Sequence, residues 1–360
     1  MATTATKEKI LNRSDLLIFF SGALAVMIAG AAYYLHWNDI VAFVTSAAAV
    51  TLLASLVGRS VEQLGDRFGP GATGVLQSAL GNLPELFIAI FALKAGMVEV
   101  VRAALVGSIL SNLLLVLGLA FFVGGIRHGS QKLDSARART IVVLMLLSVM
   151  AMAIPSLAHW VHTPAEPHEK TFSTIVSIVL LALFVLYLPA SLKRSNAPEE
   201  ATHAEAPRWP LWLAVALLAV AGLLAAFVSD WFVAALEPAM KALHISDAFA
   251  GLVIVAIAGN AIENVVGVQL AAKGQSEYAF SVIINSPLQI ALVLAPVLVI
   301  LSQAFGFSAL TLVFSPMLTT CLFLSVILAA FISFDGESNW LEGAALIGVY
   351  VVIATAFWWG

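Results

Sequence analysis

Two glutamates within long apolar stretches are the residues of this sequence best placed to do chemistry. Glu85 stands in SALGNLPELFIAIFALKAG, and Glu263 stands in AIAGNAIENVVGVQLAAKG. A charged side chain at the centre of a bilayer costs about 2.5–3.5 kcal/mol on insertion scales, so each carboxylate needs a compensating cation or proton. Burial favours the protonated carboxyl and a bound divalent cation favours the ionised one. The two residues could therefore exchange metal for protons.

Oxygen-bearing side chains accompany both glutamates. Asn82 and Asn260 each precede a glutamate by three residues, which places amide and carboxylate on one helix face. The next apolar stretches, VGSILSNLLLVLG and INSPLQIALVLAP, add further hydroxyls and amides, and oxygen is what a hard cation such as Ca²⁺ requires. The predicted cation- and proton-binding set is Glu85, Glu263, Asn82, Asn260, Ser108, Ser286, Gln289, Ser111 and Asn112, with Glu85 and Glu263 as the metal ligands. The alternative for any one Ser or Asn is a hydrogen bond between packed helices.

The two glutamates belong to an internal repeat. Gly81, Asn82 and Glu85 recur at a constant offset of 178 residues as Gly259, Asn260 and Glu263. With no gap, the same offset pairs four further residues of the first copy with identical residues in the second: Gly96, Glu99, Ser108 and Leu114 with Gly274, Glu277, Ser286 and Leu292. An ancestral duplication explains these matches more simply than coincidence.

The composition predicts an all-α polytopic membrane protein. Of 360 residues, 61% are hydrophobic and 11% are charged, and the mean hydropathy is +1.00. Stretches long enough to cross about 30 Å of hydrocarbon favour helices, which satisfy their own backbone hydrogen bonds. About eleven are present, at 15–35, 39–57, 73–95, 98–123, 138–161, 171–192, 210–236, 247–272, 277–302, 310–333 and 340–359. The third and eighth carry the glutamates, so an odd number of crossings inverts one copy relative to the other.

Charge placement predicts orientation and domain limits. Lysine and arginine concentrate on one side when the N-terminus is cytoplasmic, which leaves only Lys94, Arg102, Lys170 and Lys241 outside. Eleven spans then place the C-terminus outside. The expected domains are an N-terminal tail and first helix at 1–36, a first inverted repeat of five helices at 37–192, a cytoplasmic linker at 193–209, and a second repeat at 210–360. No basic patch for nucleic acid is present, and neither a cofactor nor a catalytic residue is expected.

The sequence resembles the cation/proton exchanger branch of the Ca²⁺/cation antiporter superfamily. The motifs that carry the resemblance are GNLPELFIAIFALKAG with LVGSILSNLLLVLG, and GNAIENVVGVQLAAKG with INSPLQIALVLAP. The resemblance implies that Glu85 and Glu263 are the cation and proton sites, and that the second and seventh spans are moving gates. Related Na⁺/Ca²⁺ exchangers typically carry Gly-Thr-Ser ahead of the Pro-Glu, whereas this chain has Gly-Asn in both copies, which favours proton coupling.

Three departures and several alternatives bear on this interpretation. The family often has His where this chain has Asn264, and Gly-Ser-Ser where it has Asn285, Ser286 and Pro287, and the acidic helix between the halves is reduced to three glutamates. All seven histidines fall in loops or near span ends, so proton coupling must use the glutamates themselves. We therefore expect a Ca²⁺/H⁺ antiporter that exports Ca²⁺ across a prokaryotic plasma membrane by alternating access. The alternatives are a Na⁺-coupled exchanger of Ca²⁺ or another divalent cation, a passive channel, and an intramembrane enzyme, which would need paired aspartates.

Overall fold

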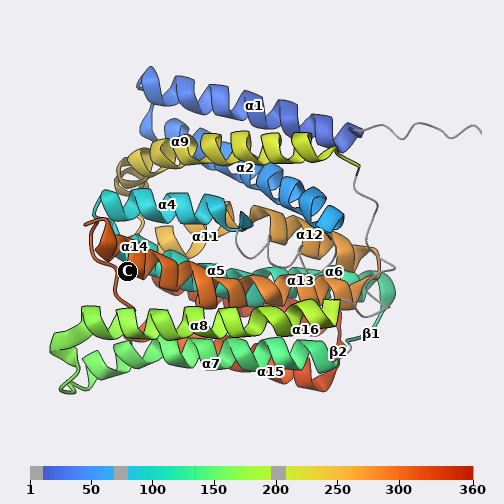
Figure 1. The fold of residues 1–360 in the computed structure, drawn as a ribbon, viewed down its shortest axis with the longest axis vertical. Helices are drawn as coiled ribbons and strands as arrows, with labels where there is room; N and C mark the ends of the chain where they lie inside the picture. Colours follow the sequence, from blue (N-terminus) through green and yellow to red (C-terminus); the bar gives the residue numbers. More distant parts are fainter. Residues whose placement is uncertain (1–10, 69–79, 134, 196–207, 360) are drawn as a thin grey trace, which may run out of the picture. The chain divides into compact units, whose positions relative to one another are not determined.

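The computed structural model describes residues 11–68, 80–133, 135–195 and 208–359. Within these ranges nearly every element is a helix, and the β structure is one two-stranded sheet (Figure 1). Helices dominate because apolar segments surrounded by lipid have no solvent partner for their backbone groups and must pair them internally. The prediction of an all-α polytopic membrane protein is confirmed.

Eight of the described helical segments are long and apolar enough to cross a membrane. They are Arg13–Tyr34, Asp39–Gly65, Val98–His128, Arg139–Trp160, Glu166–Pro189, Leu211–Leu243, Ser276–Ala304 and Trp340–Phe357. A bent pair, Asp247–Gly259 with Asn264–Ala272, passes the same test as one broken span. Of the remaining predicted spans, 310–333 is represented by the shorter apolar helix Pro316–Ile332, and 73–95 begins among residues outside the described ranges. The count of eleven therefore stays a prediction, as do the limits of the four domains.

The chain divides into two compact units. The first comprises the described residues within 1–87 and 186–235, and the second those within 88–185 and 236–360. Three helices pass from one unit into the other: α4 (Leu83–Lys94), α8 (Glu169–Ser195) and α9 (Leu211–Leu243).

The first unit is built on α1 (Arg13–Tyr34), α2 (Asp39–Phe68) and the first part of α9, which lie side by side (Figure 1). Aromatic rings join the three helices. Trp231 of α9 stacks on Tyr33 of α1 with ring centroids 5.9 Å apart, and Phe232 stacks on Phe43 of α2 at 5.3 Å. Large flat rings supply contact area with few rotatable bonds, so they fix the spacing of these helices at low entropic cost.

Polar contacts fasten one end of the first unit. Asp15 closes a capping box at the start of α1 and also accepts a hydrogen bond from Arg59 of α2 at 2.6 Å. Asp15 itself is only 1% exposed, so the guanidinium compensates a buried charge. Nearby, Gln63 accepts hydrogen bonds from the backbone amides of Arg208 and Trp209 just before α9 begins. These contacts tie α1, α2 and the start of α9 together.

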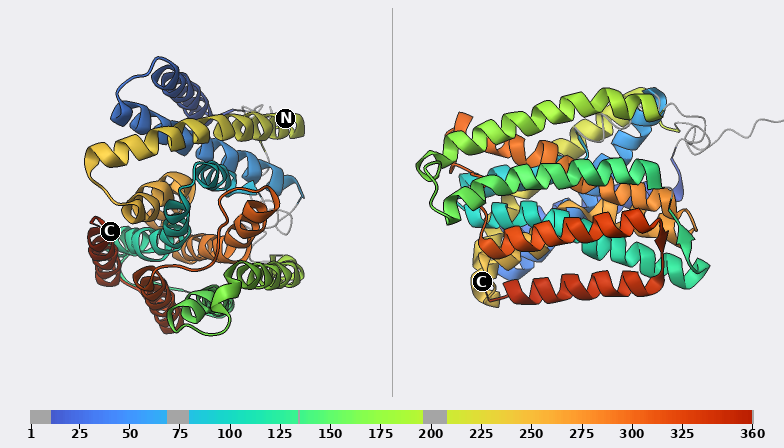
Figure 2. Two further views of the ribbon diagram at one scale, coloured as in Figure 1. Left: turned by 90° about the vertical axis from the view of Figure 1, so that its left-hand side faces the viewer. Right: turned by 90° about the horizontal axis from the view of Figure 1, so that it is seen from below.

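The second unit contains the remaining elements. They are α5 (Val98–Leu110), η1 (Ser111–Val116), α6 (Leu117–His128), β1 (Gln131–Lys132), α7 (Ser135–Trp160), η2 (Glu166–His168), α10 (Asp247–Phe249), η3 (Ala250–Val255), α11 (Ala256–Gly259), α12 (Ala261–Ala272), α13 (Ser276–Gln289), η4 (Ile290–Leu294), α14 (Ala295–Ala304), α15 (Pro316–Asp335), β2 (Glu337–Ser338) and α16 (Trp340–Phe357). The pairs α6 with α16, α7 with α15, and α12 with α13 pack along their lengths (Figure 2). The strands β1 and β2 pair antiparallel, with Gln131 opposite Ser338.

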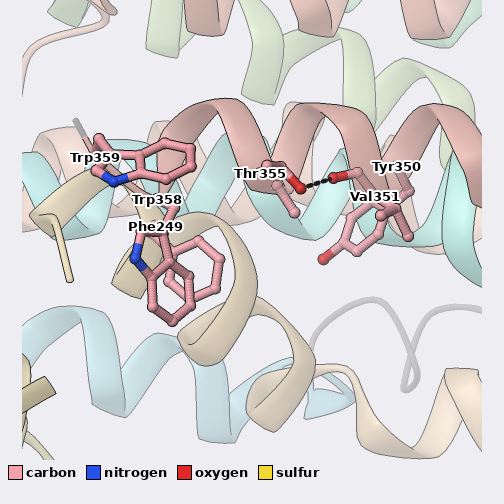
Figure 3. Close-up of a pocket in the computed structure, with 7 residues that line it drawn as sticks. Phe249, Tyr350, Val351, Thr355, Trp358 and Trp359 are labelled. Carbon is pink, nitrogen blue, oxygen red and sulfur yellow. Dashed lines mark hydrogen bonds between the residues drawn. The ribbon is translucent and has the colours of Figure 1, made fainter.

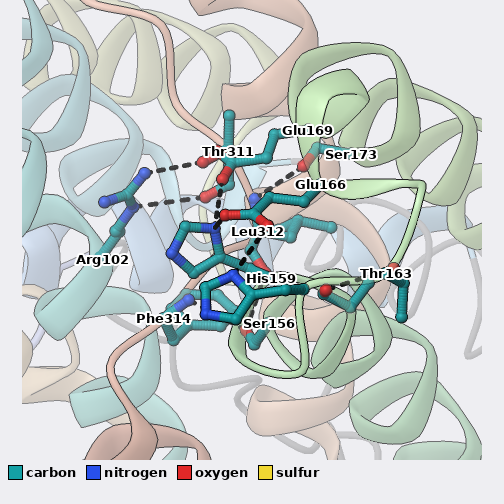
Figure 4. A network of polar contacts seen from close by, with 12 residues as sticks. Arg102, Ser156, His159, Thr163, Glu166, Glu169, Ser173, Thr311, Leu312 and Phe314 are labelled. Carbon is teal, nitrogen blue, oxygen red and sulfur yellow. Dashed lines mark hydrogen bonds and ion pairs between the residues drawn. The ribbon is translucent and has the colours of Figure 1, made fainter.

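An extended segment between α14 and α15 is held by serines from three helices (Figure 4). The backbone amides of Leu310, Leu312 and Phe314 donate to the hydroxyls of Ser302, Ser173 and Ser156, each at 2.9–3.0 Å. Ser156 also donates to the carbonyl of Leu312 at 3.0 Å. Non-helical backbone next to lipid must find such partners inside the protein, and these hydroxyls supply them.

Candidate functional site

Glu85 lies in the first turn of α4, directly after a break in the helical path. Gly81 and Asn82 form a turn, α4 begins at Leu83, and Glu85 is therefore the third helical residue. Its side chain is 6% exposed. A helix N-terminus favours negative charge because unpaired amide groups and the helix dipole are directed toward it. The local structure thus offsets part of the cost of holding an ionised carboxylate away from water.

The second repeat is broken at the equivalent point. α11 ends at Gly259, Asn260 stands between the helices, and α12 begins at Ala261. The helical path bends by 62° across this break. Glu263 is accordingly the third residue of α12, as Glu85 is of α4, while its side chain falls outside the described residues. Both glutamates therefore occupy the same position relative to a helix start.

Four of the predicted site residues form one buried polar cluster in the second unit. Asn260 donates from Nδ2 to Ser108 Oγ at 2.9 Å. Asn112 donates from Nδ2 to Asn260 Oδ1 at 3.2 Å and to Ser286 Oγ at 3.4 Å. Ser286 donates to Asn260 Oδ1 at 3.4 Å. These side chains are at most 4% exposed, and each repeat contributes two of them.

One side-chain oxygen of the cluster lacks a hydrogen-bond partner among the described residues. Asn112 is fully buried, its amide nitrogen also donates to the Ser108 carbonyl at 2.9 Å, and its Oδ1 has no hydrogen-bond partner among the described residues. A buried polar atom without a partner is costly, so such atoms usually meet water or an ion. Hydroxyl and amide oxygens are suitable ligands for a hard cation such as Ca²⁺. The donor set therefore fits the substrate that the sequence suggests.

Four other predicted site residues have side chains that the structure describes: Ser111, Gln289, Asn82 and Glu85. Ser111 and Gln289 are both buried, and the Ser111 hydroxyl has no hydrogen-bond partner among the described residues. Asn82 is half-buried in the turn before α4. Glu85 belongs to the first unit and the cluster to the second.

π-Helical turns mark both copies at the same place. In the first repeat η1 begins at Ser111, and in the second η4 begins at Ile290, directly after Gln289, the counterpart of Ser111 at the 178-residue offset. A π turn widens a helix by one residue and occurs mostly at functional sites. No sequence signal identified these turns, although the repeat explains why η1 and η4 begin at nearly corresponding positions.

A close helix crossing supports the cluster. An added Cβ at Gly107 of α5 would meet the backbone of Leu252 in η3 at 2.3 Å, and one at Gly251 would meet the Val100 carbonyl at 2.2 Å. Only glycine fits at both points, because any side chain there would collide with backbone. The crossing places Ser108 on α5 beside the helix that leads to Asn260. Neither glycine was singled out from the sequence, where glycines are frequent.

Comparison with known proteins gives likenesses over nearly the whole chain. Residues 38–193 and 213–359 match the family model described as sodium/calcium exchanger protein. The chain is 35% identical over 366 residues to the Ca(2+)/H(+) antiporter of Aphanothece halophytica, with 97% of each chain covered. It is 34% identical over 328 residues to the Ca(2+)/H(+) antiporter ChaA of Bacillus subtilis, covering 90% of this chain and 93% of the relative.

The fold is also similar to that of a solved structure. The structure of native YfkE superposes with a TM-score of 0.82 at 32% identity, covering 95% of this chain and 99% of that one. Both Gly-Asn breaks and the polar cluster fall within the residues that the family model matches.

Proposed function

The chain belongs to the sodium/calcium exchanger protein family, and from this we propose that it is a Ca²⁺/H⁺ antiporter that exports Ca²⁺ from the cytoplasm. It is an integral membrane protein, and its relatives are transporters. Proton coupling is favoured over sodium coupling because relatives that match over nearly the full chain are named Ca(2+)/H(+) antiporters. The observation that carries the proposal is the buried polar cluster to which both repeats contribute oxygen-bearing side chains.

Glu85 and Glu263 exchange the metal for protons in this proposal. Each stands third in a helix that begins after a Gly-Asn break, where the helix N-terminus stabilises the ionised carboxylate. A divalent cation binds the ionised pair, and protonation of the carboxyls releases it. Because one site cannot hold both, Ca²⁺ and H⁺ travel in opposite directions. The cluster oxygens of Ser108, Asn112 and Ser286 complete the set of ligands.

Alternating access requires two parts of the protein that can move relative to each other. The division of the chain into two compact units supports such a mechanism, since α2 and the first part of α9 belong together in the first unit. These helices correspond to the second and seventh predicted spans, which are the proposed gates. The inverted repeat offers two similar packings that can exchange roles in opening either face.

The proposed setting is a bacterial plasma membrane. Bacterial relatives such as the one from Bacillus subtilis support it. The distribution of lysine and arginine supports a cytoplasmic N-terminus and an external C-terminus. In that orientation an inward proton gradient drives Ca²⁺ out of the cell.

The test is radioactive Ca²⁺ uptake into inside-out vesicles that contain the purified protein. An acid interior should drive uptake, and an ionophore that collapses the pH gradient should abolish it. A Na⁺ gradient imposed at equal pH on both sides is the matched control, and it should drive no uptake. Uptake that follows Na⁺ and ignores the pH gradient would replace this function with Na⁺-coupled exchange.

A further inference from the structure

Tyr350 of α16 carries a buried hydroxyl that the proposed mechanism does not use. The residue is 4% exposed, and its phenol oxygen has no hydrogen-bond partner among the described residues. The hydroxyl of Ser111, a fully buried residue of η1, also lacks a hydrogen-bond partner within the described ranges. The two hydroxyls are neighbours, yet they lie outside direct hydrogen-bonding geometry. Two buried hydroxyls in this relation can be satisfied together by one water molecule that bonds to both.

One member of this pair adjoins the polar cluster in sequence, and the other lines a pocket. Ser111 immediately precedes Asn112, the residue that bonds to both Asn260 and Ser286. Tyr350 lines a pocket of about 330 Å³ together with Phe249, Thr355 and Trp358 (Figure 3). Figure 3 shows the phenol oxygen of Tyr350 pointing away from the backbone of α16. Trp358 follows Tyr350 by eight residues, about 12 Å along a helix, so the pocket leads toward the end of α16.

We propose that Tyr350 and Ser111 hold a water molecule between them and pass protons from the pocket toward the polar cluster. This inference rests on the proposed function, because it supplies the proton half of the exchange. In each transfer the phenol oxygen accepts the excess proton of a hydronium ion in the pocket, which becomes water, and gives its own proton to the bridging water. That water passes a proton on by way of the Ser111 hydroxyl. Tyr350 is neutral before and after, and one proton has moved inward.

Hydroxyl groups are needed to carry protons because the histidines are not placed to do so. Side chains that titrate near neutral pH are the usual proton carriers, and imidazole is the commonest. Six of the seven histidines lie at helix ends or in connecting segments, and His203 lies outside the described residues. Protons drawn from outside must nevertheless reach the two glutamates, which stand within apolar stretches of the sequence. A tyrosine and a serine that share a water provide a path without a permanent charge.

The test compares two transport modes in vesicles containing Tyr350→Phe. Proton-driven Ca²⁺ uptake should fall by about tenfold or more, since a positioned proton carrier contributes at least that much. Exchange of labelled for unlabelled Ca²⁺ at equal pH on both sides moves no protons, so it should keep the parent rate. Tyr34→Phe is the matched control, because it removes the same hydroxyl from an exposed position in α1, and it should leave both modes unchanged.

Three results would contradict parts of this account in distinguishable ways. Normal proton-driven uptake by Tyr350→Phe overturns the proton route. A parallel loss of both modes with Tyr34→Phe normal also overturns it, because Tyr350 would then act on Ca²⁺ binding or on folding. A parent protein with no proton-driven uptake refutes the proposed function itself, and the proton route fails with it.

Water access to the pocket provides an independent test. Cys321 is the single cysteine of the chain, so Cys321→Ala gives a background without thiols. In that background, Thr355→Cys should react with a charged thiol reagent that does not cross membranes, added on the side where α16 ends. Val352→Cys, on an exposed apolar position of the same helix, is the control and should remain unreactive. Equal lack of reaction at both positions means that lipid fills the pocket, and the route is overturned.

Discussion

The side-chain amide of Asn112 donates a hydrogen bond to Oδ1 of Asn260, 148 residues further along the chain, at 3.2 Å. Asn112 belongs to the first repeat and Asn260 to the second, so this bond joins the two copies at the level of the broken helices. Ser108 and Ser286 also hydrogen-bond to the side chain of Asn260. The two repeats are therefore coupled through polar groups and not through apolar packing alone.

Replacing the two asparagines should reveal this coupling as a non-additive effect on stability. Residues in one hydrogen-bond network typically show interaction energies of about 0.5–3 kcal/mol in a double-mutant cycle. Asn112→Ala and Asn260→Ala should together cost less than the sum of their separate losses. Thermal unfolding of the four proteins in detergent measures the cycle. Asn112→Ala combined with Ser177→Ala serves as the control and should be additive, and additivity in the asparagine pair would refute the network.

The crossing of α5 and η3 should tolerate no side chain at Gly107. Alanine there would bring its Cβ to 2.3 Å from the Leu252 backbone, so the helices must separate or the protein must lose stability. We expect Gly107→Ala to lower the melting temperature and the transport rate together. Gly348→Ala in α16 is the matched control, because its added Cβ would meet nothing within 4 Å. Alanine favours a helix over glycine by about 1 kcal/mol, so the control should be neutral or stabilising.

Ser156 should be more important than its small size suggests. It donates to the Leu312 carbonyl and accepts from the Phe314 amide, so Ser156→Ala leaves two buried backbone groups without partners. Each such group costs about 1–3 kcal/mol. Ser177→Ala removes only a bond to the Ser173 carbonyl within the same helix and should cost much less. Equal melting temperatures for the two variants would contradict the assigned role of Ser156.

Asp15→Asn should loosen the contact between α1 and α2. The substitution removes the ion pair with Arg59 and weakens the capping box with Asn12. Because Arg59 is 31% exposed, water can solvate its freed charge, and we expect a loss of only about 1–2 kcal/mol. Asp39→Asn, at an exposed position in the first turn of α2, is the control. Guanidinium or thermal unfolding of both variants would show whether the difference is present.

Sequence reasoning reached the helical membrane fold and the members of the polar cluster for identifiable reasons. Glu85 and Glu263 are conspicuous because charge is expensive in lipid, and the 178-residue repeat links Ser108 to Ser286 and Asn82 to Asn260. Asn112 was found because it follows Ser108 at helical spacing. The helical path breaks at both Gly-Asn pairs of the repeat.

Other features could not be predicted because they depend on which helices meet. Ser156 and Ser173 are single serines in apolar helices, and only the packing shows that both reach the 310–314 segment. The role of Tyr350 could not be predicted either, because it is a single polar residue in a helix that carries no other site residue. The close crossing at Gly107 depends on the approach of the Leu252 backbone. The π turns arise where the backbone hydrogen bonds of a helix shift by one residue, and no residue type specifies that shift.

The most direct measurement is proton-driven Ca²⁺ uptake by Glu85→Gln and Glu263→Gln in vesicles, beside Glu237→Gln, which alters an exposed glutamate paired with Lys241. Glutamine keeps the shape and the oxygen but cannot exchange a proton for a metal. The account predicts that each of the first two variants folds, retains its melting temperature and loses uptake, while Glu237→Gln transports like the parent. Normal uptake by either site variant would show that its glutamate does not carry the exchange.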